Sequence, residues 1–177
     1  MTKSPNILFA LATAALCLPA LASAQLDETI DNAALQTKVK ARLLSEAPME
    51  ATAANLETEN GVVQLGGFID DEMRGKKAAE IVAGMEGVRK VDNQLHAKPG
   101  DRDTSQAIDD GMLTTRVKAR LADADLGTAA DVNIDTYNGV VLLTGFVDSE
   151  ETKNLTEKYV AEQKDVKRVI NGIYVRD

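Results

Sequence analysis

The sequence contains few of the residues on which redox and metal chemistry depend. It has one cysteine, one histidine, no tryptophan and three tyrosines. Because the single cysteine, Cys17, lies near the start, the rest of the chain can form no disulfide and no thiolate metal site. The stability of the folded chain must therefore come from packing alone.

Catalytic groups are equally scarce. Since the only histidine is His96, no nucleophile in the chain has an evident imidazole base. The carboxylates that could resemble an acid–base or calcium cluster stand in pairs where helices are expected to begin, which is a more ordinary role. They are Asp70, Glu72, Asp148 and Glu150. The sequence shows no phosphate-binding glycine loop and no metal-ligand spacing, so we expect no enzyme activity, no cofactor and no metal site.

Positive charge is also in deficit. Lys and Arg number 20 against 28 Asp and Glu, which gives a formal net charge of −8. A chain this acidic is a poor candidate for nucleic-acid binding, which depends on neutralising phosphates. Any attraction to an anionic membrane would have to come from a local basic patch that acts against the net charge.

Long hydrophobic runs are confined to the N-terminus. Residues 7–21 form an apolar segment after Lys3, and Ala22-Ser23-Ala24 matches the small-x-small pattern of a cleavage site. We predict a signal peptide over residues 1–24, cleavage before Gln25, a periplasmic location and no transmembrane segment in the mature chain. The alternative is an uncleaved anchor, for which the apolar segment falls short of the ~20 residues that span a bilayer.

The most informative feature of the sequence is an internal duplication. Residues 30–98 align without a gap with residues 108–176, and about 26 of the 69 aligned positions are identical. Similarity over this length indicates two small domains, each with its own core. We predict a first domain over 25–98, a linker over 99–107 and a second domain over 108–177. The linker is polar and contains Pro99-Gly100, which is typical of a flexible connector.

Each repeat centres on a strand–turn–strand pattern. Asn60-Gly61 and Asn138-Gly139 stand between apolar runs, and this is the strongest local hairpin signal because both turn residues need positive φ. Gly67 and Gly145 follow in the second strand of each hairpin. A glycine in a strand indicates a close backbone approach, here by a helix that packs on the sheet.

A helix is expected before and after each hairpin. The first helix of each repeat carries apolar residues at every fourth position, which form one stripe facing a core. These stripes are Leu35, Val39 and Leu43 in repeat 1, and Leu113, Val117 and Leu121 in repeat 2. The second helix of repeat 1 is expected to bury Met73, Ile81 and Met85.

The ends of the elements complete the predicted fold. Asp31 or Asn32 can cap the first helix of repeat 1, and Asp109 or Asp110 that of repeat 2. A last strand follows the second helix, over 166–175 in repeat 2. We therefore predict an α+β fold of two αββαβ domains, each a three-stranded mixed sheet with two helices on one face.

Two strand motifs recur in both copies. One is Val63-Gln64-Leu65-Gly66-Gly67 and Val141-Leu142-Leu143-Thr144-Gly145; the other is Gly87-Val88-Arg89-Lys90-Val91-Asp92-Asn93, with Asp165 in the place of Gly87 in repeat 2. This pattern resembles the BON domain (bacterial OsmY and nodulation), twice, over nearly the whole mature chain. The resemblance implies an αββαβ fold, a periplasmic location, no known catalysis, and roles in phospholipid binding or in protection against osmotic and envelope stress.

Lipid binding is the first functional hypothesis. Basic residues flank the apolar stripe of each opening helix, and long basic side chains beside apolar surface can reach toward phosphates. The candidates are Arg116, Lys118 and Arg120 in repeat 2, and Lys38, Lys40 and Arg42 in repeat 1. The resemblance implies that the repeat 2 helix is the one that meets anionic lipid. The alternative is an ordinary amphipathic helix with a solvated face, and these helices carry no aromatic anchor.

Protein binding is the second hypothesis. The sheet face away from the helices is far more apolar in repeat 2, where it carries Val140, Leu142, Phe146, Ile170 and Tyr174. An apolar face of this kind usually marks an interface. It could pack on repeat 1, on another copy of the protein, or on unfolded clients in a chaperone role. The predicted partners are therefore anionic phospholipid or proteins of the periplasm and envelope, and the sequence does not fix the oligomeric state.

Overall fold

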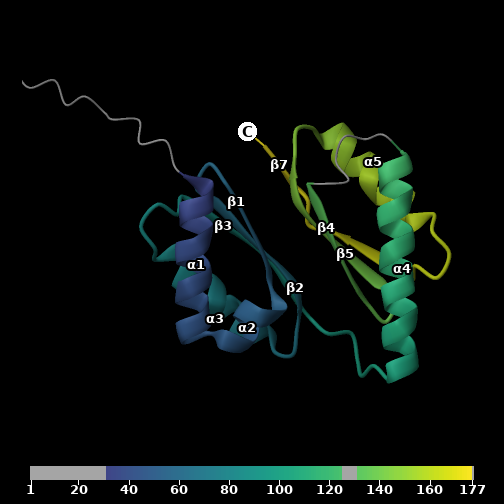
Figure 1. Cartoon of the computed structure of the whole chain (residues 1–177), viewed down its shortest axis with the longest axis horizontal. Helices are drawn as coiled ribbons and strands as arrows, with labels where there is room; N and C mark the ends of the chain where they lie inside the picture. Colours follow the sequence, from purple (N-terminus) through teal and green to yellow (C-terminus); the bar gives the residue numbers. More distant parts are fainter. Residues whose placement is uncertain (1–30, 125–130, 177) are drawn as a thin grey trace, which may run out of the picture.

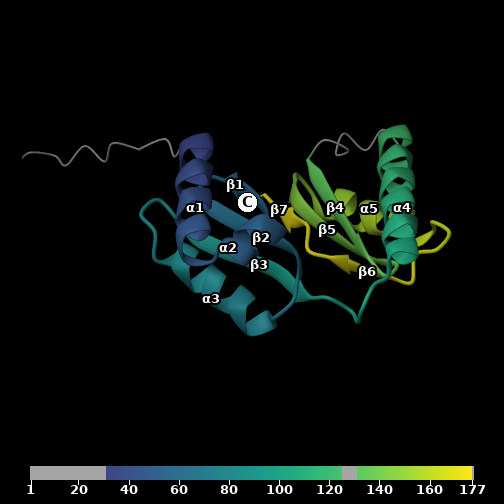
Figure 2. The same ribbon diagram turned by 60° about the horizontal axis from the view of Figure 1, so that its bottom comes forward.

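In each repeat a sheet is covered by helices, and the two sheets face each other between two outer helical layers (Figures 1 and 2). The computed structural model describes residues 31–124 and 131–176, so the predicted signal peptide over 1–24 lies outside the described residues. The order of elements confirms the predicted α+β fold of two tandem αββαβ units, with one extra short helix in repeat 1 and a divided last strand in repeat 2.

The two repeats have matching elements. Repeat 1 comprises α1 (Asn32–Glu46), α2 (Pro48–Ala53), β1 (Asn55–Glu59), β2 (Val62–Ile69), α3 (Glu72–Ala83) and β3 (Lys90–Ala97). Repeat 2 comprises α4 (Thr104–Asp123), β4 (Val132–Tyr137), β5 (Val140–Val147), α5 (Glu150–Ala161), β6 (Arg168–Asn171) and β7 (Tyr174–Val175). In each sheet the central strand pairs antiparallel with the strand before it and parallel with the strand or strands after it.

The hairpin turns form as predicted. Both turn residues have positive φ in each copy, at 46° for Asn60 and 77° for Gly61, and at 52° for Asn138 and 77° for Gly139. This is the backbone that a two-residue type I′ turn requires. The turn sets the register of each hairpin, so that the alternate residues of β2 and β5 face the helices.

Each repeat has its own core between helices and sheet. The predicted stripes on α1 and α4 are buried, and they pack on the helix-facing residues of the sheets, which include Val63 and Leu65 in repeat 1. Burial of one such side chain contributes about 1.5–3 kcal/mol. Met73, however, was wrongly placed in the core and is 69% exposed. The fully buried residues of α3 are Gly75, Ala78 and Val82, and the predicted Ile81 and Met85 are partly buried and pack against the same core.

Gly67 gives the close approach that the sequence predicted. Its φ is +149°, and a Cβ at this position would lie 2.5 Å from the carbonyl oxygen of Ala53, at the end of the extra helix α2. Gly145 has a φ of +127° and meets the carbonyl of Asp131 in the same way. A side chain at either position would push the preceding segment off the sheet.

Helix α4 begins earlier than the sequence predicted. Asp103 caps it in a reciprocal capping box with Gln106, and neither Asp109 nor Asp110 is a cap. The helix thus takes up residues 104–107 of the predicted linker. The physical reason is that the capping box satisfies the free amides about two turns earlier, which leaves Asp110 inside the helix on its buried face.

The last strand of repeat 2 is divided in two. Strands β6 and β7 both pair with β5 and are separated by Gly172 and Ile173, where a continuous strand was predicted. The side chain of Gln94 from repeat 1 lies 2.7–2.8 Å from the position that a Cβ of Gly172 would occupy. The strand is therefore interrupted at the place where the Gln94 side chain of repeat 1 packs against it.

Candidate functional site: the outer face of helix α4 and its surroundings

The apolar sheet face of repeat 2 lies against repeat 1. Leu142 and Val140 are buried in one cluster with Phe68 of repeat 1, and Tyr137 and Ile170 pack against this cluster. Phe146 is also buried, and its ring lies 5.5 Å from that of Tyr174. In the structure this face is covered, so a client protein could reach it only if the repeats separated.

The contact between the repeats is pseudo-symmetric. The side-chain amide of Asn55 donates to Asp135 at 2.5 Å, and the amide of Asn133, the counterpart of Asn55, donates to Glu57 at 3.0 Å. Burial raises the pKa of Asp135, while the bond from Asn55 opposes that rise. The two bonds are related by exchange of the repeats, as in an isologous dimer. The chain is thus arranged as a two-fold dimer fused into one polypeptide.

Gln64 is the polar centre of this contact, and sequence reasoning missed it. It is 1% exposed. Its amide donates to Asp92 at 2.6 Å and to the carbonyl oxygen of Gly172 at 2.7 Å, and its oxygen accepts the amide of Gly145. The sequence indicated its special role only by a glutamine at the position where repeat 2 has the apolar Leu142. All of these bonds except the one to Asp92 join the two repeats.

His96 lies at the edge of the same contact. It is opposite Phe68 in the parallel pair of β3 with β2. Burial lowers the pKa of its imidazole first of all, the positive charge of Arg168 on repeat 2 lowers it further, and Glu72 opposes the change. Its Nε2 atom is buried without a hydrogen-bond partner. Its neighbours Phe68 and Arg168 give His96 the position of an interface residue.

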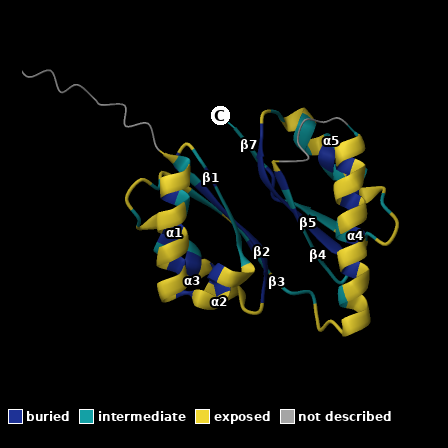
Figure 3. Ribbon diagram, viewed as in Figure 1, coloured by how far each residue is buried: buried dark blue, intermediate teal, exposed yellow. Residues whose placement is uncertain are grey.

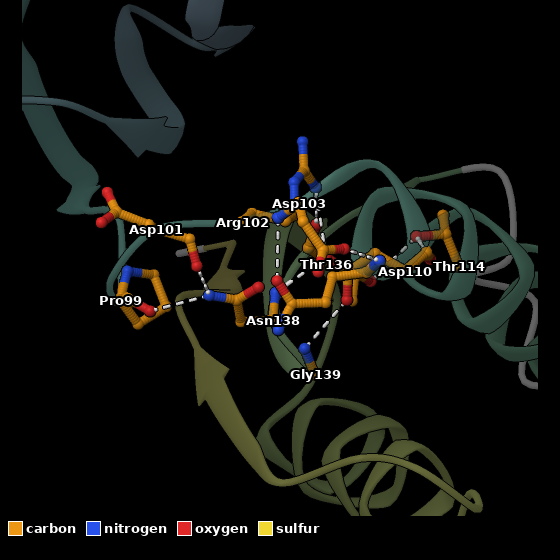
Figure 4. Close-up of polar contacts among 10 residues, drawn as sticks. Pro99, Asp101, Arg102, Asp103, Asp110, Thr114, Thr136, Asn138 and Gly139 are labelled. Atoms are coloured by element: carbon orange, nitrogen blue, oxygen red, sulfur yellow. Dashed lines mark hydrogen bonds and ion pairs between the residues drawn. The ribbon is translucent and has the colours of Figure 1, made fainter.

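A buried carboxylate fixes the connection between the repeats (Figure 4). Asp110 accepts the backbone amides of Asn138 at 2.8 Å and Gly139 at 2.9 Å, and pairs with Arg102 at 3.1 Å. The side-chain amide of Asn138 donates in turn to the carbonyl oxygens of Pro99 and Asp101. The connecting segment that was predicted to be flexible is therefore bound to the hairpin turn of repeat 2.

The outer face of α4 is exposed, and Arg116 is the one charged residue among those that line its groove. Ile108 and Met112 are 60% and 58% exposed, and the face is coloured as exposed along the helix in Figure 3. These two side chains line a shallow groove of about 510 Å³ with small residues of the same face and Arg116. The small residues are Gly111, Thr115 and Ala119. Large apolar side chains that are gathered on one open face are uncommon unless they meet a partner.

The predicted lipid-binding cations of α4 lie on both sides of this face. Both terminal nitrogens of Arg116 lie 3.2 Å from one carboxylate oxygen of Asp165. The guanidinium of Arg120 stacks over the ring of Tyr159 at 4.8 Å. Lys118 is exposed on the opposite side. The three cations thus border the groove rather than form one cluster.

Helix α1 of repeat 1 has the charges without the apolar groove. Lys38, Lys40 and Arg42 are all exposed, and Arg42 pairs with Glu46 at 2.8 Å. Ala34 occupies the position of Met112, so Leu44 is the single large apolar residue on the exposed surface of α1, at 50% exposure. Of the two opening helices, α4 therefore has the more amphipathic outer face.

Two further properties concern only the described part of the chain, residues 31–124 and 131–176. None of its helices is long and apolar enough to cross a membrane. It contains no group of His, Cys, Asp and Glu side chains arranged to hold a metal ion.

The chain was compared with known proteins. The BON domain model matches residues 31–99 and 109–177. Osmotically-inducible protein Y of Escherichia coli K12 is 30% identical over 145 residues, which cover 81% of this chain and 72% of that protein. The outer membrane lipoprotein DolP of Haemophilus influenzae is 30% identical over 145 residues, covering 81% and 70%. A 21 kDa hemolysin of Actinobacillus pleuropneumoniae is 27% identical over 148 residues, covering 81% and 75%.

The first family match spans all the elements of repeat 1, and the second begins within α4 at residue 109 and spans the hairpin, the second helix and the last strands of repeat 2. The chain therefore belongs to the BON-domain family and carries two BON domains in tandem.

Proposed function

We propose that this chain is a non-enzymatic protein of the bacterial periplasm that binds anionic phospholipid surfaces through the outer face of α4. The observation that carries the proposal is the exposure of Ile108 and Met112 on a helix face bordered by Arg116 and Lys118. Apolar side chains gain free energy when they enter the acyl boundary. Each cation near an anionic surface adds about 1 kcal/mol.

The relatives support a role at the cell envelope. One is named for osmotic induction and another is an outer membrane lipoprotein. The predicted signal peptide over residues 1–24 is consistent with export to that compartment. We propose that the protein supports envelope integrity or tolerance of osmotic stress through weak contacts with the membrane surface.

The net charge of −8 restricts where the chain can touch an anionic membrane. The chain as a whole is repelled by an anionic surface, so attraction is limited to the place where cations and apolar side chains coincide. A chaperone role on the sheet face of repeat 2 would require the repeats to separate, because Leu142 is fully buried between them.

Flotation of the mature chain, residues 25–177, with liposomes tests the proposal. We expect it to float with vesicles that contain phosphatidylglycerol and not with pure phosphatidylcholine, and salt should weaken the binding. Ile108→Glu with Met112→Glu should abolish it. Met112→Glu alone should already weaken it, and its control is Leu44→Glu on α1, which adds the same charge at an exposed apolar position of repeat 1 and should lower binding far less. Equal losses in both variants, or no binding to anionic vesicles, would refute the role of α4.

A further inference from the structure

A second hollow lies beside the groove of α4. It is a cleft of about 290 Å³ between α4, the hairpin turn of repeat 2 and the segment that connects α5 to β6. Two cations line it, Arg116 from α4 and Lys167 from the connecting segment. Met112 and Arg116 line both the cleft and the groove, so the two hollows are contiguous.

Lys167 is held at the cleft by the hairpin turn. Its backbone amide donates to the carbonyl oxygen of Gly139 at 2.8 Å. Its Cγ and Cδ atoms lie 3.1 Å from the position that a Cβ of Gly139 would take. No ion pair between its ammonium and another described residue falls within salt-bridge distance. The cleft thus contains a positioned cation that no described residue neutralises by an ion pair.

Arg116, in contrast, is occupied by an anion that belongs to the chain. Asp165 accepts both of its terminal N–H groups at 3.2 Å. Asp165 has a φ of +73°, a conformation that favours glycine, and repeat 1 has Gly87 at the corresponding position with a φ of +88°. The aspartate therefore has a left-handed backbone conformation that Asp and Asn adopt more readily than other side chains, and its carboxylate contacts the cation as an external anion would.

Two other carboxylates line the cleft. Asp110 is buried, and its oxygens already accept the amides of the hairpin turn and pair with Arg102. Asp109 lies on the exposed side of α4. Neither makes a recorded contact with Arg116 or Lys167, so Asp165 is the group that competes for the cation.

We propose that this cleft is the phosphate subsite of the lipid-binding face, and that Asp165 occupies it as an internal competitor when no lipid is bound. The proposal rests on the proposed function and adds a position for the headgroup. The phosphate of one phospholipid displaces Asp165 from Arg116 and is shared with Lys167, while the apolar part of the lipid contacts Ile108 and Met112 in the contiguous groove.

Charge-matched variants test the competitor. Asp165→Asn keeps a side chain that tolerates positive φ but removes the competing charge, and it should raise the partition onto phosphatidylglycerol vesicles about threefold to tenfold, as expected for loss of one ion pair. The control is Asp70→Asn, which removes the same charge and breaks a similar exposed ion pair with Lys98 in repeat 1. It should change the partition less than about twofold.

The outcomes separate the two proposals. If both variants raise binding equally, or if the gain of Asp165→Asn survives the addition of Arg116→Gln, the competitor role is wrong while lipid binding stands. If neither the unmodified chain nor Asp165→Asn binds anionic vesicles, both proposals fail. A titration with inorganic phosphate, followed by NMR of the Arg116 and Lys167 amides, adds a further arm. Shifts there without vesicle binding would assign the cleft to soluble phosphate and overturn its assignment to lipid.

Discussion

The two repeats have one fold and differ mainly at the surfaces they present. The residues that build each core are the same or closely similar, whereas the residues toward the other repeat and toward solvent have diverged. Gln64 faces Gly145 and Gly172 from one side, and the apolar Leu142 faces Phe68 from the other. After the duplication the two cores stayed similar, while the residues on each outward face diverged.

The largest expected effect comes from removing the apolar half of the interface. Leu142→Glu with Ile170→Lys places two charges in the cluster between the repeats, and burial of unpaired charge is strongly unfavourable. We expect the repeats to separate while each core stays folded. Small-angle scattering should show a larger radius of gyration with unchanged circular dichroism. An unchanged radius would mean that the interface does not hold the repeats together.

The next effect contrasts the two hairpin turns. Asp110→Ala leaves the backbone amides of Asn138 and Gly139 without a partner and removes the ion pair of Arg102, so it should lower the free energy of unfolding by about 2–4 kcal/mol. The corresponding residue of repeat 1 is Asn32, whose side-chain oxygen has no hydrogen bond. Asn32→Ala should cost less than about 1 kcal/mol. Urea denaturation measures both, and equal losses would contradict the difference between the turns.

A smaller loss of stability is expected when Gln64 is replaced by the leucine that repeat 2 has at the same position. Gln64→Leu introduces the residue that repeat 2 carries and leaves the Gly145 amide and the Gly172 carbonyl unpaired. We expect a loss of about 1–3 kcal/mol. Hydrogen exchange should show the Gly145 amide losing protection while the core amides of α1 and α4 keep theirs. Retained protection of Gly145 would show that the bond from Gln64 is dispensable.

The smallest effect concerns pH. Because burial and Arg168 lower the pKa of His96 in the folded protein, the neutral imidazole is the form that the interface favours. Its contribution is complete above the ordinary histidine pKa of 6.5 and is lost as the pH falls through the lowered value. The single histidine gives one imidazole signal in NMR, and Arg168→Gln should shift its midpoint upward. A midpoint that does not move would place Arg168 too far away to act.

The sequence predicted the parts of the structure that depend on local pattern. The hairpin turns follow from Asn-Gly, and the stripes on α1 and α4 follow from helical spacing. The predictions from local pattern were wrong where contacts between residues distant in the sequence determine the structure. Asp110 was taken for a cap because the sequence does not show that its carboxylate meets a turn 28 residues further on.

The candidate site was predictable only in part. The cations of α4 were found from their spacing, but their separate partners, Asp165 and Tyr159, lie on other segments. The exposure of Ile108 was missed because the helix was expected to begin after it, and Met112 received no assignment because it lies off the predicted core stripe. Gln64 is visible in the sequence as a polar residue within an apolar strand. Its role could not be predicted because its partners Gly145 and Gly172 lie on the other repeat.

The binding of the connecting segment to repeat 2 raises the effective concentration of one repeat near the other. The segment joins the end of β3 to the start of α4 and is held by Asn138 and Arg102. A short tether keeps the two halves at a high effective concentration, so their contact needs little intrinsic affinity. The apolar cluster around Leu142 can then hold the repeats together while the polar bonds of Gln64, Asn55 and Asn133 orient them, and the paired arrangement persists however dilute the protein becomes.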